Sequence, residues 1–247
     1  MHIAVRCGSI ALPLVAELMN AKDRKEVIAK TVEDENSQAK VRIAGAWRIW
    51  NEHAGDETFV QGRVVAKSQS TNPDHVFEIH PISVYGQFDV RETFKPIDGY
   101  KPKEAEAAFS RYEGTRSRIK FSDQSKTVTV VSAGLGYNYV HFQMRLSESP
   151  NKIVDGYRAF AEIEDWEGEL IHRKRRMILV EGTPPANAAK DLKAGECLRV
   201  LGIPRLNLSL VNYRVEQARK GRTELLSWNL PYEIIVVGVY DSVCEKD

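Results

Sequence analysis

The sequence lacks an excess of either charge, with 35 lysines and arginines against 34 aspartates and glutamates. A formal net charge of +1 argues against a protein whose whole surface binds nucleic acid or an anionic membrane, although a local basic groove is compatible with it. Cysteine is also scarce. Cys7, Cys197 and Cys244 stand far apart and form no CxxC motif, so we predict free thiols and a cytoplasmic location.

Long apolar runs are missing as well. No stretch approaches the roughly 20 apolar residues that a membrane-spanning helix needs, so we expect no transmembrane segment. The fairly apolar run 9–19 is interrupted by Pro13 and Glu17, which disfavours a signal peptide. The chain also has neither the GxSxG pattern of a serine nucleophile nor a P-loop. No standard catalytic motif therefore marks it.

Segments of alternating apolar and polar residues are abundant, and this pattern is typical of β-strands. The predicted strands cover residues 2–6, 10–18, 41–50, 59–66, 75–85, 127–132, 139–146, 157–163, 170–181, 197–201, 206–215 and 232–240. Short helices are predicted after Asp23, after Pro102 and over 185–193, the last capped by Thr183.

The order of these elements predicts the fold class. Three strands, a helix and two further strands form the five-stranded OB barrel. The second half fits this order best, with 185–193 as the helix between the third and fourth strands. We therefore predict a mostly β protein with a few short helices. It would form two OB-like barrels or sandwiches, over residues 1–114 and 115–247.

The segment 75–81, His-Val-Phe-Glu-Ile-His-Pro, carries the most chemistry. As a strand it places Phe77 and Ile79 on one face, toward the core, and Glu78 and His80 on the other. A carboxylate beside an imidazole can perform general acid–base catalysis. The alternative is a structural hydrogen bond, with Pro81 ending the strand pairing at a sheet edge.

The strand 41–47, in which Gly45 predicts a bend, a bulge or a close backbone approach, precedes this segment. Together they resemble a pattern in uncharacterised bacterial OB-like proteins that carry a His-x-x-Glu-Ile-His-Pro segment. The resemblance covers about forty residues and matches at Glu78, His80 and Pro81. Members more usually have glycine and tryptophan where this chain has Val76 and Phe77. The resemblance implies a fold rather than an activity.

A basic run on one predicted strand is the candidate ligand-binding feature. Its residues are Arg173, Lys174, Arg175 and Arg176, which could contact phosphates. Aromatic residues that could stack on bases are Tyr137, Tyr139 and Trp166. The alternatives are a solvated edge strand that blocks aggregation and aromatic residues that belong to the core.

Metal ligation needs several convergent ligands. The candidates are His53, His75 and His80, if the loop that holds His53 folds back toward the strand that holds the other two. No cofactor is predicted, and a divalent metal stays open as an alternative.

Three classes of function remain. The sequence favours a non-catalytic protein that binds single-stranded nucleic acid, a protein partner or an oligosaccharide. The second class is a small hydrolase or nuclease that uses Glu78 and His80, with or without a metal. The third is a structural subunit of an assembly. The oligomeric state is not predicted.

Overall fold

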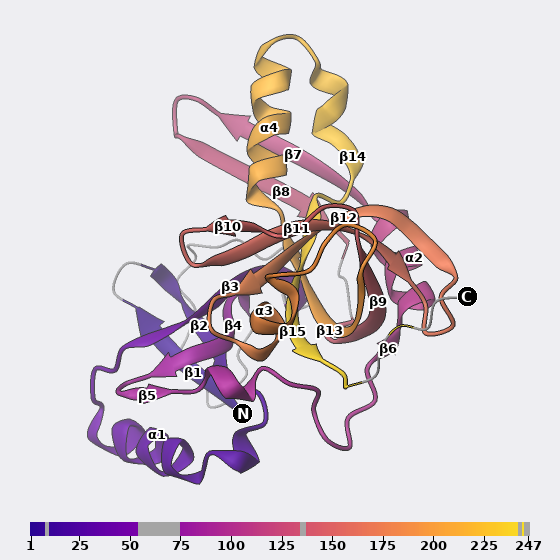
Figure 1. The fold of residues 1–247 in the computed structure, drawn as a ribbon. Coiled ribbons are helices and arrows are strands. Elements are labelled where there is room, and N and C mark those ends of the chain that lie inside the picture. The colour runs from indigo at the N-terminus through magenta and orange to yellow at the C-terminus, as the bar shows by residue number, and fades with distance from the viewer. Residues whose placement is uncertain (8–9, 54–74, 134–136, 242–243, 245–247) are drawn as a thin grey trace.

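The computed structural model describes residues 1–7, 10–53, 75–133, 137–241 and 244 (Figure 1). This part of the chain is mostly β, with four α-helices and several sheets. The predicted strand 59–66 lies outside the described residues. Among those described, no helix is both long and apolar enough to cross a membrane.

The first sheet is built by the N-terminal part of the chain, in the strand order β1-β2-β4-β3, with β5 paired to β4. These strands are β1 (His2–Cys7), β2 (Ile10–Glu17), β3 (Ile43–His53), β4 (His75–Tyr85) and β5 (Phe88–Asp89). The sheet is flanked by the 3-10 helices η1 (Ala21–Asp23) and η2 (Arg91–Thr93) and by α1 (Lys25–Ser37). Val27 of α1 belongs to the same buried hydrophobic cluster as Leu18, Ile82 and Tyr85. β2 and β4 run parallel, so Glu17 lies near β4.

Strand β4 covers the predicted residues 75–85, and its pairing does not end at Pro81 as the alternative interpretation held. It continues to Tyr85, and β2 and β3 pair with it on its two sides. The β3 register shifts between Gly45 and Trp47, which pair with Ile82 and Ile79. This bulge lets the strand pass a proline, which has no N–H to offer. The predicted close approach at Gly45 is confirmed, since a Cβ there would lie 2.3 Å from the Pro81 carbonyl oxygen.

The second sheet has the order β10-β11-β12-β15-β13-β9-β6, and β9 also pairs with β11. The pairings thus form a ring, β9–β11–β12–β15–β13–β9, in which β12 and β15 are parallel. Its members are β6 (Lys103–Glu104), β9 (Val140–Leu146), β10 (Asn151–Ile153), β11 (Gly156–Glu164), β12 (Leu170–Val180), β13 (Cys197–Leu206) and β15 (Tyr232–Val239). No such ring exists among the described strands of the first sheet, and two OB-like barrels stay a prediction.

Two helices complete the main core. α2 (Ala105–Gly114) buries Phe109 and Tyr112 among the side chains of the second sheet, where they meet Trp50 from β3. α3 (Pro184–Ala189) lies between β12 and β13, where a helix was predicted, but it ends at Ala189 instead of residue 193. Thr183 occupies the N-cap position, as predicted, but its hydroxyl does not cap the helix, because it donates to the Val180 carbonyl oxygen instead.

A lobe formed by β7 (Arg116–Ser122), β8 (Thr127–Ser132), β14 (Ser227–Asn229), α4 (Leu208–Arg219) and the 3-10 helix η3 (Thr223–Leu226) projects from the second sheet (Figure 1). The predicted strand 206–215 is wrong, because α4 occupies most of it. The Asn207 side chain caps this helix by accepting from the Leu210 amide. Val211 and Val215, four residues apart, pack against Ile119.

The cysteine prediction is also wrong for two of the three residues. Cys197 on β13 and Cys244 form a disulfide. Their separation of 47 residues hid the pairing, because spacing alone cannot show that a distant segment returns to β13. The division of the chain at residue 114 stays a prediction.

Candidate functional site

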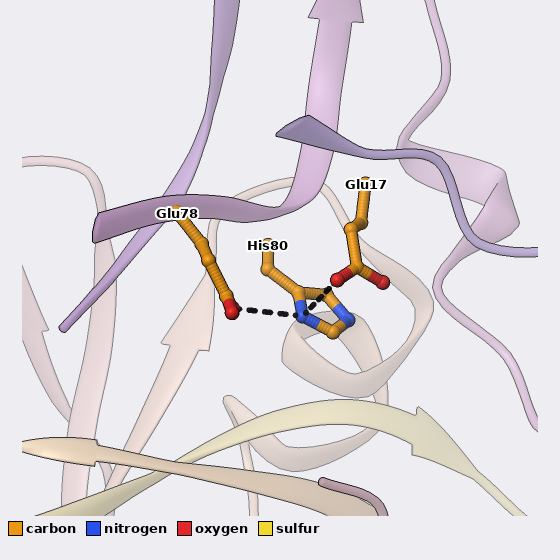
Figure 2. A group of neighbouring side chains, drawn as sticks. All are labelled: Glu17, Glu78 and His80. Carbon is orange, nitrogen blue, oxygen red and sulfur yellow. Dashed lines mark hydrogen bonds and ion pairs between the residues drawn. The ribbon is translucent and has the colours of Figure 1, made fainter. Parts of the chain in front are cut away.

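A cluster of buried ionisable side chains lies where the first sheet meets the second. Glu17 comes from the end of β2, and Glu78 and His80 come from β4 (Figure 2). Arg48 on β3 and Tyr139, which directly precedes β9, complete it. Pairing of β2 with β4 and of β3 with β4 brings these residues together.

His80 is the centre of the cluster and is fully buried. Its Nδ1 lies 3.2 Å from Glu78 Oε2 and 3.5 Å from Glu17 Oε1. Figure 2 shows the two carboxylates on either side of this nitrogen. Its Nε2 lies 2.6 Å from the Tyr139 hydroxyl. Because a carboxylate can only accept, Nδ1 carries a proton, and neutral His80 then accepts from Tyr139 at Nε2.

Glu78 is held as a carboxylate by three partners. Arg48 Nη1 donates to its Oε2 at 2.6 Å, and His75 Nε2 lies 3.1 Å from its Oε1. Burial by itself raises the pKa of Glu78, but the Arg48 guanidinium and the hydrogen bonds from His75 and His80 outweigh burial and hold the pKa well below its usual range. Arg48 also donates through Nε to the Pro204 carbonyl of β13, which joins the two sheets.

Glu17 is the carboxylate of the cluster that lies nearest to solvent. Its Oε2 is 3.1 Å from His2 Nε2. Burial raises the pKa of Glu17, but the electrostatic interaction with the neighbouring His80 imidazole and the hydrogen bond from His2 lower it more, so the pKa falls below its usual value. Both carboxylates are therefore ionised at neutral pH.

Tyr139 is a lining residue of two cavities. A cavity of about 320 Å³ is lined by His2, Glu17, Asn20 and Tyr139 among others. A second, of about 420 Å³, is lined by Tyr100, Lys103, Tyr137 and Tyr139 among others. Burial, followed by the charge of Glu17, raises the pKa of the Tyr139 hydroxyl well above its usual value, so this group stays protonated. Glu17 and Tyr139 are thus the members of the cluster that reach a cavity.

A metal would find three candidate ligand atoms here. One atom each of Glu17, Glu78 and His80 lies within 4.8 Å of the others. However, Arg48 already donates to Glu78 Oε2 and supplies the positive charge that a metal would bring. The geometry therefore favours a metal-free network of charges and protons.

The predicted metal triad differs from this cluster. His75 and His80 both contact Glu78. The backbone of His53 pairs opposite His75, but its side chain lies outside the described residues. The prediction that His53 lies on a loop is wrong, because His53 is the last residue of β3. The third residue grouped with Glu78 and His80 is Glu17 from β2.

Glu78 and His80 lie on one side of β4, as predicted, but this side is more deeply buried than the side of Phe77 and Ile79. Glu78 and His80 share a side and contact each other, and both are almost fully buried, whereas Phe77 and Ile79 are only half-buried. The reason is that the polar face of the first sheet is covered by the second sheet. The expectation that Phe77 enters the core is wrong.

The basic run on β12 is only partly available to a ligand. Arg175 contacts Glu113 and stacks over Tyr232, and Arg176 pairs with Glu233 at 3.2 Å. Lys174 lies over the Phe160 ring and is exposed, as is Arg173.

The predicted aromatic residues do not share one surface. Tyr137 is exposed at the second cavity, whereas Tyr139 is buried between both. Trp166 is half-buried and stacks on His141, with Arg199 on its ring. The predicted platform of basic and aromatic residues is therefore divided among several elements.

Sequence reasoning missed Glu17 and Arg48 as members of the cluster. Each stands out as a charged residue within an apolar strand, Glu17 at the end of β2 and Arg48 between Trp47 and Ile49. Such charges signal a buried partner. The parallel pairing that identifies the partner has no local signal. Comparison with protein-family models, curated proteins and solved structures found no match to this chain.

Proposed function

We propose that the protein is a small acid–base enzyme of the hydrolase class, in which Glu78, His80 and Tyr139 relay a proton. The observation that carries the proposal is the chain of contacts from Glu78 Oε2 to His80 Nδ1 and from His80 Nε2 to the Tyr139 hydroxyl, at 3.2 and 2.6 Å. A carboxylate, an imidazole and a hydroxyl in this order follow the logic of a catalytic triad.

The relay accounts for both protons of a hydrolysis. A water in the cavity that is lined by both Glu17 and Tyr139 attacks the substrate and gives a proton to the Tyr139 oxygen. At the same time, Tyr139 gives its own proton to His80 Nε2. Breakdown of the intermediate reverses the transfer, so that the leaving group receives a proton from Tyr139 and His80 becomes neutral again. The net reaction adds water across one bond.

Charged groups surround the imidazole that takes part in the relay. Glu17 and Glu78 carry two negative charges beside Nδ1, and Arg48 balances one of them. An imidazolium neutralises the other. In a buried site this interaction is much less screened than in water, so the preformed carboxylates stabilise the charge as it develops.

We also infer that the ring of pairings β9–β11–β12–β15–β13 is an OB-like barrel. The strand order, the parallel pair β12–β15 and the position of α3 between the third and fourth strands support this inference. In this arrangement Tyr139 stands at the start of the first barrel strand.

The experiment is a screen of chromogenic carboxylic and phosphate esters, followed by kinetics on each substrate that is hydrolysed. Tyr139→Phe and His80→Gln should each lower kcat at least about 100-fold, with unfolding temperatures measured alongside. Tyr213→Phe, at an exposed tyrosine of α4, is the matched control and should leave kcat unchanged. Hydrolysis that is equal in Tyr139→Phe and the parent would refute the relay.

A further inference from the structure

The second cavity has the features of a ligand site that the proton relay does not use. Its volume of about 420 Å³ falls in the range of small-molecule pockets. Two exposed tyrosine rings, Tyr100 and Tyr137, stand at it, and the ring of Tyr139 packs edge-on against Tyr100 with centroids 5.4 Å apart. Aromatic rings at a cavity offer stacking surfaces to a planar ligand.

Tyr137 is held there at a conformational cost. Its φ angle is 73°, in the left-handed region that bulky residues avoid. Its carbonyl accepts a hydrogen bond of 2.8 Å from the buried Tyr112 hydroxyl, which fixes the backbone. A glycine would adopt this angle freely. A large, half-exposed ring in such a position points to a role for the ring itself.

The cavity also offers positive charge and an unsatisfied hydrogen-bond acceptor. Lys101 and Lys103 line it, and Lys103 Nζ lies 4.8 Å from the Tyr137 ring centroid. The acidic residue of the lining, Glu104, contacts His141 at 2.6 Å. Asn138 Oδ1 is buried and accepts no hydrogen bond from the described residues, so a ligand N–H or O–H could satisfy it.

We propose that this cavity binds a ligand of nucleotide chemistry, in which a planar heteroaromatic ring is joined to a phosphate. The ring would stack on Tyr137 and donate to Asn138 Oδ1, and the phosphate would face Lys101 and Lys103. The same chemistry is presented by a free mononucleotide and by one unit of a single strand. This site does not require proton transfer by His80.

Isothermal titration calorimetry with adenosine 5′-monophosphate, adenosine and inorganic phosphate tests the proposal. The monophosphate should bind more tightly than either of the other two probes. Tyr137→Gly and Tyr137→Asn should each weaken its binding at least about tenfold, as expected for loss of one stacking partner. Both variants should keep or increase the unfolding temperature, because glycine and asparagine tolerate a positive φ.

Further variants show whether the two lysines hold the phosphate and whether binding is confined to this cavity. Lys101→Gln with Lys103→Gln should weaken binding of the monophosphate but not of adenosine. Tyr213→Ala, at an exposed tyrosine on α4, should change nothing. Nucleotide binding is measured in the absence of any ester substrate, so failure of the relay and failure of this site are distinguishable.

A short single-stranded deoxyadenosine oligonucleotide is the second arm of the experiment. Stronger binding of the strand than of the monophosphate, lost in Tyr137→Gly, would support the site and identify a strand as its source. Preference for the monophosphate, with the same loss, would identify a free nucleotide. No heat with any probe at millimolar concentration, or binding that Tyr137→Gly leaves unchanged, would overturn the proposal.

Discussion

Arg48→Met is the substitution that most sharply tests the energetics of the buried cluster. Methionine keeps much of the aliphatic volume but removes the guanidinium. Arg48 is fully buried and donates to Glu78 Oε2 and to the Pro204 carbonyl oxygen, at 2.6 and 2.8 Å. The variant therefore leaves a carboxylate and a carbonyl buried without these donors.

The expected loss of stability follows from these two contacts. A hydrogen bond that involves a charged group contributes about 1.5–3 kcal/mol, so two of them predict a loss of about 3–6 kcal/mol. Removing one member of a buried ion pair typically costs about 3–5 kcal/mol. Both routes give a loss that is a large fraction of the stability of an ordinary domain.

The loss should also depend on pH, with a definite sign. The folded-state pKa of Glu78 lies well below its ordinary value of 4.5, so its ionised form stabilises the parent above that pH. This contribution disappears as the pH falls through the folded pKa. Without Arg48, burial raises the pKa of Glu78, so the carboxylate of the variant protonates first. The difference between parent and variant should therefore shrink on acidification.

The assay is urea unfolding of both proteins at a series of pH values from neutral to acidic. Arg219→Met is the control, since this exposed arginine pairs with Asp123 at the surface and should change stability little. Glu78→Gln combined with Arg48→Met should lose less than the sum of the single variants. A small, pH-independent loss in Arg48→Met would refute the account of the cluster.

Three further predictions concern the fold. Gly45→Ala should destabilise the protein by about 1–3 kcal/mol in urea unfolding, because its Cβ would lie 2.3 Å from a backbone oxygen of β4; Gly114→Ala, with nothing within 4 Å, should be neutral or stabilising. Serine at both Cys197 and Cys244 should lower stability by up to about 4 kcal/mol, the chain-entropy value for their 47-residue separation; an unfolding curve insensitive to reductant would contradict the disulfide. Asn207→Ala should cost about 1 kcal/mol through loss of the α4 cap, and an unchanged midpoint would argue against that cap.

The sequence identified local features where a short pattern decides the structure. Alternation placed Glu78 and His80 on one side of a strand, and Gly45 indicated the close approach that the bulge at Pro81 requires. Prediction from the sequence failed where contacts between distant segments determine the structure. The burial of Glu78 comes from the second sheet, and Glu17 reaches His80 through a parallel pairing; neither leaves a local signal.

The strand predicted over 206–215 failed for a related reason. Its residues are compatible with either structure, and packing of Val211 and Val215 against Ile119 favours the helix. The basic run on β12 shows why a function is harder to predict from the sequence than a strand. The same charges that suggest a phosphate site in sequence are partly neutralised by Glu113 and Glu233, which lie far along the chain.

The proposed relay requires that the Tyr139 hydroxyl donates a hydrogen bond to His80 Nε2, while His80 Nδ1 donates to Glu78. The most direct measurement is the ¹⁵N NMR spectrum of the His80 imidazole at neutral pH, in the parent and in Tyr139→Phe. The account predicts that Nδ1 carries the proton of the neutral ring, that Nε2 accepts a hydrogen bond, and that the Nε2 shift changes in the variant. A proton on Nε2 of the neutral ring, or an Nε2 shift unaffected by loss of the tyrosine hydroxyl, would contradict it.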